Sequence, residues 1–393
     1  MTNMFRRSMS KATDLTRTGR LQEATALIQS LLSRQPGTAG TATTVTDPND
    51  DAVEGRFTRL TEAPPAAASP ARPKRPARTS AGLRSGLSET LRKIASGGMP
   101  GAMRPSQSGV DMPAGAQFMS LTHLSAQGSR DYRLYVPAAK PATPMPLIVM
   151  LHGCTQTPED FAAGTGMNAL AEEFGCIIAY PAQPTGANAQ KCWNWFRPAD
   201  QVRDRGEPEL IAGLTRDILR DHPVDAARVY VAGLSAGGAA AAIVASAYPD
   251  IFCAAGVHSG LPVGSAQDVP SAFAAMRSGA AGTRLGSAVP TISFHGSADG
   301  TVHPRNGAAV VKQALRGHPG VKPAIDTGTS TGGRTWRRTS HRKGDGPTLA
   351  EHWEVDGAGH AWSGGTAAGS YTDAAGPDAS REMLRFFLQH KRG

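Results

Sequence analysis

Short apolar runs and amphipathic stretches alternate along the chain from about residue 115 onward. The apolar runs are continuous, as is typical of strands buried on both faces of a sheet, and lie at 146–153, 176–181, 228–235, 252–260, 290–297 and 351–357. Stretches with helical spacing separate several of them, at 161–174, 208–222 and 236–249. This alternation predicts an α/β fold with a mostly parallel central sheet and helices on both faces.

Two further segments at the start of this region also have strand character. Residues 116–124 and 129–137 are rich in apolar and β-branched positions and are separated by a short turn, which predicts an antiparallel pair. We find no internal repeat. We therefore expect one α/β domain over residues 115–390.

The residues before this domain have a different pattern. Apolar residues of segment 1–35 recur on one face at helical spacing, which predicts an N-terminal amphipathic helical segment. Residues 36–110 are rich in Pro, Ala and Gly, a composition that buries little apolar area. We expect a basic, partly disordered linker there, with a short helix near 83–95.

The positive net charge of +9 is concentrated in the N-terminal part. Residues 1–105 hold 16 of the 41 Lys and Arg residues but only 8 of the 32 Asp and Glu residues. The rest of the chain is nearly neutral, which argues against a nucleic-acid groove in the α/β domain. The basic part predicts a solvated arm, with binding to an anionic surface as the alternative.

Cysteine spacing and hydropathy exclude several classes of protein. The four cysteines form no CxxC pair and no Cys/His zinc spacing, so we expect no structural metal site. No run approaches the about 18 apolar residues of a transmembrane helix. The N-terminus lacks the roughly 7–15 apolar residues of a signal peptide, which favours a cytoplasmic location.

Residues 229–238, VYVAGLSAGG, place a serine between two glycines, after an apolar run and before a series of alanines. Gly233, Ser235 and Gly237 match the G-x-S-x-G pattern of a nucleophile on a strand-to-helix turn. The glycines permit a strained turn and a close approach of the following helix. Because the pattern falls between a predicted strand and a predicted helix, we interpret Ser235 as a nucleophile rather than part of an ordinary tight turn.

A serine nucleophile needs a base and an acid that orients the base, and in this arrangement both follow the serine on loops after strands. Asp299 follows the run 290–297 and His360 follows the run 351–357, so we expect these residues to complete the site. Asp356 is an alternative acid, although we interpret it as the end of its strand. The other candidates fit less well in order or position: Asp204, Asp217, His295, His303, His341 and His352. Of these, the two aspartates precede the serine, and we interpret the histidines as packing, pocket-lining or surface residues.

Attack on a carbonyl group also requires donors for the oxyanion. The first donor is expected to be the backbone N–H of Ala236, directly after the nucleophile. The second is expected from the loop after 146–153, where His152, Gly153 and Cys154 stand, and we assign it to the N–H of Cys154. Taken alone, this loop is equally consistent with an ordinary glycine turn.

Residues 192–196, CWNWF, gather aromatic side chains in a chain with only 6% aromatic residues. Such a cluster belongs either to the core or to the wall of a ligand-binding cleft, because ligand sites favour aromatic linings. We expect substrate contacts from this segment and from residues beside the oxyanion loop and His360, namely His152, Trp193, Asn194, Trp195 and Trp362.

The motifs RLYVP, LHGCTQ, AYP, CWNWF, GLSAGG, FHGSAD and GHAWSGG occur in this order over roughly residues 115–390. As a set they resemble the polyhydroxybutyrate (PHB) depolymerase family of esterases, which is related to feruloyl and acetylxylan esterases. The resemblance implies an α/β-hydrolase fold in which Ser235 is the nucleophile, Asp299 the acid and His360 the base. It also implies that Cys154 is an oxyanion donor.

The resemblance implies a disulfide between Cys154 and Cys192, beside the site. It further implies a serine esterase that hydrolyses short-chain hydroxyalkanoate esters or oligomers, free or at a polymer surface, and needs no cofactor. A feruloyl or acetylxylan-type carbohydrate esterase is the alternative. A non-catalytic binding scaffold of the same fold is the hypothesis from a different class.

Two features differ from the secreted polymer-degrading members that this chain resembles. Those members carry C-terminal linker and substrate-binding domains, whereas 33 residues follow His360 here, so we do not expect efficient attack on crystalline polymer. They also begin with a signal peptide, whereas this chain begins with a basic segment. The resemblance keeps an extracellular location open, and the oligomeric state is open as well.

Overall fold

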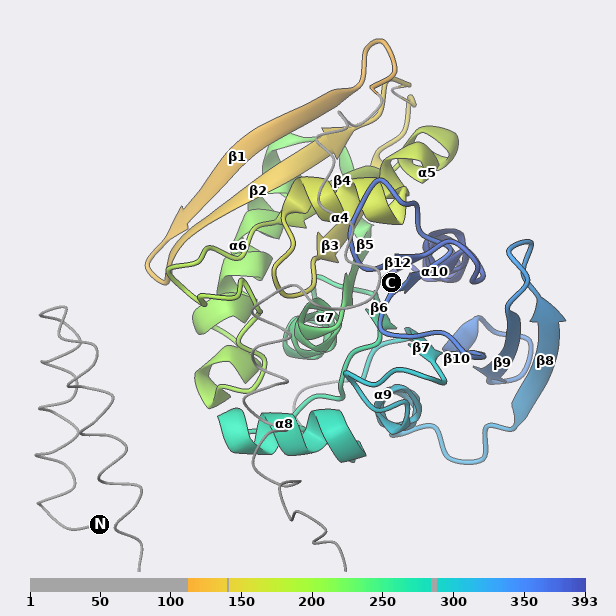
Figure 1. The fold of residues 1–393 in the computed structure, drawn as a ribbon. Coiled ribbons are helices and arrows are strands. Elements are labelled where there is room, and N and C mark those ends of the chain that lie inside the picture. Colours follow the sequence, from red (N-terminus) through yellow and green to blue (C-terminus); the bar gives the residue numbers. More distant parts are fainter. Residues whose placement is uncertain (1–111, 140, 284–287) are drawn as a thin grey trace, which may run out of the picture. The chain divides into compact units, whose positions relative to one another are not determined.

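The computed structural model describes residues 112–139, 141–283 and 288–393 (Figure 1). The helical segment expected at 1–35 and the linker expected at 36–110, with its short helix near 83–95, lie outside the described residues. Among the helices of the described part, none is both long enough and apolar enough to cross a membrane.

One large sheet organises the described residues, with its strands in the order β1-β2-β4-β3-β5-β6-β7-β10-β9-β8. The strands are β1 (Gln117–Ser125), β2 (Gly128–Val136), β3 (Met145–Leu151), β4 (Ile177–Pro181), β5 (Val224–Leu234), β6 (Ala254–His258), β7 (Thr291–Gly296), β8 (Pro323–Thr329), β9 (Thr335–Arg342) and β10 (Thr348–Val355). Strands from β4 to β10 in this order pair in parallel, and the strands at both edges pair antiparallel. The mostly parallel sheet predicted from the apolar runs is confirmed.

The central strands show why their sequences are continuously apolar. Every residue of β3, β6 and β7 is buried, because helices cover both faces of the sheet. The expected N-terminal pair is also present, with Gln117 of β1 opposite Val136 of β2. Both faces of the central strands therefore supply core residues.

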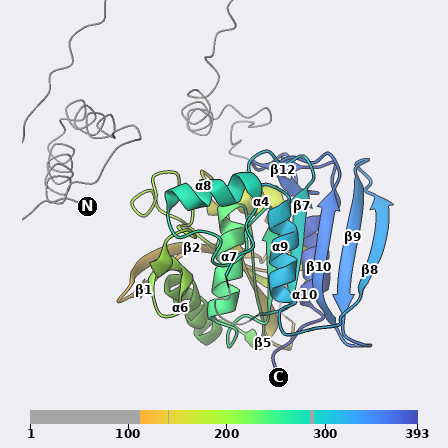
Figure 2. The same cartoon turned by 90° about the horizontal axis from the view of Figure 1, so that it is seen from below.

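The helices divide between the two faces of the sheet. They are α4 (Pro158–Thr165), α5 (Met167–Phe174), α6 (Gly206–Asp221), α7 (Ala236–Ala247), α8 (Val269–Ser278), α9 (Arg305–Ala314) and α10 (Ala379–Phe387), with a short 3-10 helix, η1 (Pro198–Gln201). One hydrophobic core contains residues of α6 and α7, and a second contains residues of α4, α5 and α10. Figure 2 shows α7, α8 and α9 on the same side of the sheet.

The helical stretch expected over 161–174 is present as two helices rather than one. Gly166 adopts a left-handed conformation with φ 64°, and its N–H donates to the carbonyl of Ala162 to end α4. The next helix, α5, begins at once with Met167. Glycine adopts this conformation readily, so the chain changes direction without strain.

The apolar runs in the sequence did not predict strands β8 and β9, which form one edge of the sheet. All residues of β8 are exposed except Gly328, which is half-buried, so this strand has no apolar signature. His341, expected in a polar surface segment, lies in β9 opposite Pro323. A second, small parallel sheet of β11 (Trp362–Ser363) and β12 (Thr372–Asp373) follows His360.

Candidate active site

Ser235 is the single residue between β5 and α7, and its backbone is strained. It has φ 59° and ψ −119°, a conformation that residues with a side chain rarely adopt. Its N–H donates to the carbonyl of His258 on β6 at 2.8 Å, and its own carbonyl accepts the N–H of Ala239 at 3.0 Å. These two bonds fix the serine between a strand end and a helix start.

The glycines on either side of Ser235 allow this turn to press against the end of β3. A Cβ atom on Gly237 would lie 2.1 Å from the carbonyl oxygen of Leu151 and 2.5 Å from that of His152. A Cβ atom on Gly233 would lie 2.4 Å from the carbonyl of Gly237. Only glycine fits at either position, so the serine turn packs directly against the loop after β3.

Asp299 and His360 meet, although 61 residues separate them in the sequence. Nδ1 of His360 lies 2.7 Å from Oδ2 of Asp299, and the two side chains are 6% and 0% exposed. Oδ1 of Asp299 accepts the N–H groups of Thr301 and Val302, each at 2.9 Å. Because a carboxylate only accepts hydrogen bonds, Nδ1 carries the proton and Nε2 of His360 keeps its lone pair.

The environment of Asp299 favours its ionised form. Burial opposes ionisation, but the nearby imidazoles of His295 and His360 outweigh it and hold the pKa of Asp299 well below its usual range. The carboxylate is therefore charged at neutral pH and able to stabilise a protonated His360. The hydroxyl of Ser235 makes no hydrogen bond with another residue of the described chain, and such catalytic bonds are often long before substrate binds.

His258, at the end of β6, is a residue of the site that the motifs did not indicate. It is fully buried, its ring stacks on Trp362 with centroids 4.9 Å apart, and its Nε2 accepts the N–H of Ser363 at 2.9 Å. Burial lowers the pKa of His258 to about 3, so the ring is neutral and can accept this bond. The segment that follows His360 is thereby attached to the same strand whose carbonyl holds the N–H of Ser235.

His295, which we interpreted as a packing residue, lies against Asp299. Its Nε2 is 2.8 Å from the carbonyl oxygen of Val302 and 3.4 Å from Oδ2 of Asp299. The available sequence signal was the same for His258 and His295: a histidine in a buried position at the end of a parallel strand. Catalytic loops gather at that edge in open α/β sheets.

The loop after β3 presents free backbone donors near the serine turn. His152 is buried, which lowers its pKa to about 4, and Gly153 donates its N–H to Oε1 of Gln156 at 2.9 Å. Among the described residues, none accepts the backbone N–H of Cys154 or that of Ala236. These are the two groups that the sequence indicated as oxyanion donors.

A disulfide joins Cys154 to Cys192 and so connects this loop to the segment CWNWF. Beside the disulfide, Nε1 of Trp193 donates to the carbonyl of His152 at 3.0 Å, and the guanidinium of Arg130 lies 5.5 Å from the indole centroid. The loop is therefore attached to this segment by one covalent bond and one hydrogen bond.

Glu207 of α6 fixes the same segment from the other side. It accepts the backbone N–H of Asn194 at 2.7 Å and the side-chain amide of Asn194 at 2.6 Å. Gln183 also donates to Glu207, at 2.5 Å, and accepts from Arg130 at 2.5 Å. The carboxylate of Glu207 and the amides of Gln183 and Asn194 thus have partners that compensate for lost water, whereas Nε of Arg130 has none among the described residues.

The expected direct substrate contacts need correction, because these side chains are buried. Their residues are exposed by 1%, 0%, 2%, 6% and 1%, respectively: His152, Trp193, Asn194, Trp195 and Trp362. Trp193 and Trp195 both belong to a hydrophobic core cluster. The structure therefore supports the alternative in which this aromatic cluster is core, packed behind the site.

Two residues nearer the surface were not indicated by the sequence. Thr155, directly after Cys154, has φ 67°, and Tyr371 has φ 53°. Their hydroxyl groups lie 3.2 Å apart, which connects the loop after β3 to the segment before β12. Neither residue belongs to a motif that indicates positive φ, so this contact was not predictable.

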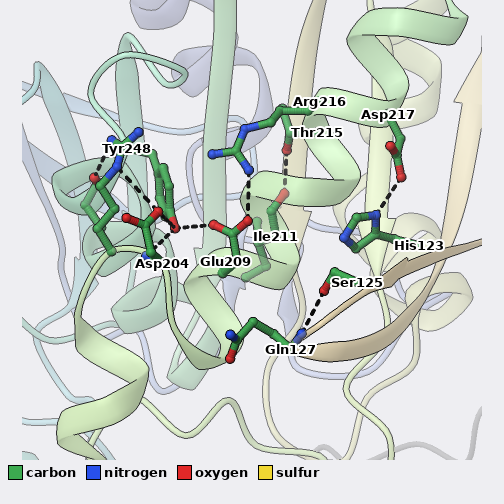
Figure 3. Close-up of polar contacts among 12 residues, drawn as sticks. His123, Ser125, Gln127, Asp204, Glu209, Ile211, Thr215, Arg216, Asp217 and Tyr248 are labelled. Carbon is green, nitrogen blue, oxygen red and sulfur yellow. Dashed lines mark hydrogen bonds and ion pairs between the residues drawn. The ribbon is translucent and has the colours of Figure 1, made fainter.

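The alternative acids that precede the serine have other partners (Figure 3). Oδ2 of Asp217 lies 2.5 Å from Nδ1 of His123. Asp204 donates its backbone N–H to the hydroxyl of Tyr248 at 2.7 Å, and its side chain lies beside the same hydroxyl. Both carboxylates belong to contacts around α6 rather than to the pair formed by Asp299 and His360.

A serine on a strand-to-helix turn, with an aspartate and a histidine on later loops, defines an α/β-hydrolase fold. The solved acetyl xylan esterase from Aspergillus awamori has a similar fold, with a TM-score of 0.55 and 20% identity over 70% of this chain and 99% of that chain. Within the described residues, no group of three or more His, Cys, Asp or Glu side chains is arranged to hold a metal ion.

A family model described as Esterase PHB depolymerase matches residues 130–334, just over half of the chain. The chain belongs to this family. Poly(3-hydroxyalkanoate) depolymerase C of Paucimonas lemoignei is 35% identical over 259 residues, which cover 61% of each protein. Poly(3-hydroxybutyrate) depolymerase of Ralstonia pickettii is 30% identical over 61% of this chain and 54% of the relative. Feruloyl esterase B of Neurospora crassa is 36% identical over 32% of this chain and 42% of the relative.

Proposed function

We propose that this protein hydrolyses carboxylic esters, with Ser235 as the nucleophile, His360 as the base and Asp299 as the acid that orients it. The observation that carries the proposal is the buried contact of 2.7 Å between Nδ1 of His360 and Oδ2 of Asp299. The strained turn at Ser235 supports it, because such a turn exposes a serine hydroxyl at the edge of the sheet. Membership of an esterase family supports the reaction class.

The protonation states at the site set the order of steps. Nε2 of His360 takes the proton of Ser235 as its oxygen attacks the ester carbonyl, and the charged Asp299 stabilises the imidazolium. His360 then gives this proton to the leaving alcohol, which leaves the acyl group on Ser235. Water, activated by the same Nε2, releases the acid and restores the serine.

The backbone N–H groups of Ala236 and Cys154 would bind the oxyanion of each tetrahedral intermediate. Both lack acceptors among the described residues, and the packing of Gly237 against Leu151 presses the two loops that carry them together. Loss of one such donor lowers turnover by about 10²–10³. The disulfide between Cys154 and Cys192 would hold the second donor in place.

We infer that residues 115–390 are the catalytic unit and that the substrates are short-chain hydroxyalkanoate esters or oligomers. Support comes from the two depolymerases, which match over a larger share of this chain than feruloyl esterase B does. Esters of plant polysaccharides are the second candidate, because feruloyl esterase B also matches. The chain spans 61% and 54% of the two depolymerases, so their substrates are a starting point for assay.

Hydrolysis of p-nitrophenyl butyrate by the wild type and by Ser235→Ala tests the mechanism. We expect the variant to lose about 10⁴-fold or more in kcat, because the other groups retain only weak catalysis. The matched control is Ser125→Ala, at the exposed β1–β2 turn, which should keep wild-type turnover. Equal rates for Ser235→Ala and the wild type would refute the proposal.

The same preparation can separate the two substrate classes. Turnover of hydroxybutyrate oligomers is compared with that of methyl ferulate and acetylated xylan at equal enzyme concentration. We expect the highest kcat/KM with the oligomers. A large preference for ferulate or acetylated xylan would instead establish the carbohydrate esterase alternative.

A further inference from the structure

His295 lies against the pair formed by Asp299 and His360, and its Nε2 approaches the same carboxylate oxygen as Nδ1 of His360. It occupies β7 and is 1% exposed, and its Nε2 is the ring atom nearest to Asp299. That atom is 2.8 Å from the carbonyl oxygen of Val302 and 3.4 Å from Oδ2 of Asp299. Val302 also donates its own N–H to Oδ1 of Asp299. The imidazole therefore contacts both the carboxylate and the loop that holds it.

Both neighbours of Nε2 are acceptors, which determines where the proton of His295 lies. A carbonyl oxygen and an ionised carboxylate have no hydrogen to donate, so Nε2 carries the proton. We propose that His295 is a positioning residue: its Nε2–H is donated to the carbonyl of Val302, whose own N–H is donated to Asp299, and it thereby holds the carboxylate in the orientation that His360 requires. The inference rests on the roles proposed above for Asp299 and His360.

The other ring nitrogen of His295 supports this assignment. Nδ1 is buried and has no hydrogen-bond partner among the described residues, and the same is true of Nε2 of His352 on β10. Both nitrogens face Gly307 of α9, where an added Cβ would lie 2.9 Å from the first and 2.8 Å from the second. Gly307 thus lets α9 pack closely on the two rings and restrict the position of His295.

Several ionisable groups surround His295 from other elements. They are His258 from β6, Asp299 and His360 from loops, and His352 from β10, with His341 of β9 behind His352. The described residues of α9 that are buried against the sheet carry no charge. Asp299 is therefore the only carboxylate in this group of described residues. Its Oδ2 lies near a ring nitrogen of both His295 and His360.

Loss of the donor at His295 would change how Asp299 acts on His360. With Val302 less firmly held, Oδ1 of Asp299 receives a weaker hydrogen bond, and the carboxylate stabilises the protonated imidazole of His360 more strongly. His360 must be unprotonated to act as a base, so the acidic limb of the pH profile moves to higher pH. A side chain with only a packing role would not move this limb.

The test compares His295→Phe with His295→Gln in the full chain. Phenylalanine keeps a planar ring but removes the donor, whereas the Nε2 of glutamine can restore it. For His295→Phe we expect kcat with p-nitrophenyl butyrate to fall about tenfold, the upper range expected for the loss of one hydrogen bond. We also expect the acidic limb of the pH profile of kcat/KM to shift by about half a unit to higher pH. His295→Gln should lie close to the wild type in both measurements.

Titration of the reactive serine with a fluorophosphonate gives turnover per competent site and separates misfolded protein from altered catalysis. A His295→Phe enzyme with wild-type kcat per site and an unmoved acidic limb would overturn the inference. Equal impairment of His295→Gln and His295→Phe would overturn it too, since the donor would then not matter. If Ser235→Ala kept full turnover, the proposed function itself would fail, which is a different result.

Gly307→Ala provides a second test that leaves His295 unchanged. The added methyl group must displace one or both rings, because it would lie within 3 Å of two nitrogens. We expect the acidic limb to move in the same direction as for His295→Phe, by a smaller amount. The control is Gly186→Ala, where a Cβ meets nothing within 4 Å. A folded Gly307→Ala enzyme with an unmoved acidic limb would count against the role of His295.

Discussion

Ser235 and His360 are held in place by different means. The turn at Ser235 is built from backbone: a strained φ of 59°, a bond to the carbonyl of His258, and two glycines that contact neighbouring main-chain atoms. His360 depends on side chains instead, through the buried carboxylate of Asp299. One half of the site is thus defined by shape, and the other by charge and hydrogen bonding.

This difference teaches where each half of the site is vulnerable. An added side-chain atom destabilises the backbone turn, because the neighbouring main-chain atoms cannot move aside. A buried polar pair fails when a donor or an acceptor is exchanged, even at constant volume, because the unpaired group cannot reach water. Substitutions that change only volume or only polarity should therefore affect the two halves unequally.

The largest effect is expected from Asp299→Asn, which changes polarity at constant volume. Oδ1 of the amide can still accept from Thr301 and Val302, but its NH₂ group then faces Nδ1 of His360. The imidazole must present an acceptor at Nδ1, so its proton moves to Nε2 and the base is lost. We expect kcat to fall by about 10⁴, the magnitude known for this exchange in a serine protease triad.

The stability of Asp299→Asn is measured by urea unfolding beside its kcat. Because the side chain keeps its shape, we expect the unfolding midpoint to move less than for a substitution in the serine turn. If Asp299→Asn kept more than a tenth of wild-type turnover, Asp299 would not be the acid of the site.

The second effect, Gly237→Ala, changes volume in the backbone half. The new Cβ would lie 2.1 Å from the carbonyl oxygen of Leu151, so α7 or β3 must shift. We expect the free energy of unfolding to fall by about 3 kcal/mol, the upper range for overpacking, and turnover to fall as well. Urea unfolding and kcat are measured beside Gly186→Ala, whose Cβ is unobstructed. A Gly237→Ala protein as stable as this control would contradict the close packing of the turn.

The same difference explains what the sequence could reveal. The backbone half is local: Gly233, Ser235 and Gly237 are neighbours in the chain, and their spacing between a predicted strand and a predicted helix indicated a strained turn. The central strands were equally visible, because burial on both faces requires continuous apolar runs. The edge strand β8 was not visible, because its exposed residues need no apolar pattern.

The side-chain half was only partly predictable. Chain order indicated Asp299 and His360, but the surroundings of this pair come from β6, β7, β10 and α9, which are distant in sequence. His258 and His295 belong to no motif that assigns them a role, so only their contacts in space relate them to the site. The tryptophans of CWNWF show the opposite case, since composition favoured a cleft and burial places them in the core.

The smallest effect is expected from Asp356→Asn, which tests whether the acid is defined by environment or by distance along the chain. Asp356 stands four residues before His360, but it is exposed and accepts from the hydroxyls of Ser297 at 3.1 Å and Thr335 at 3.4 Å. An amide can still accept one of these bonds, and an exposed carboxylate is screened by water. We therefore expect kcat and the pH profile to stay within about twofold of the wild type, the range of a weak surface interaction. A loss comparable to that of Asp299→Asn would show that His360 turns toward Asp356 during catalysis, and the assignment of the acid would pass to Asp356.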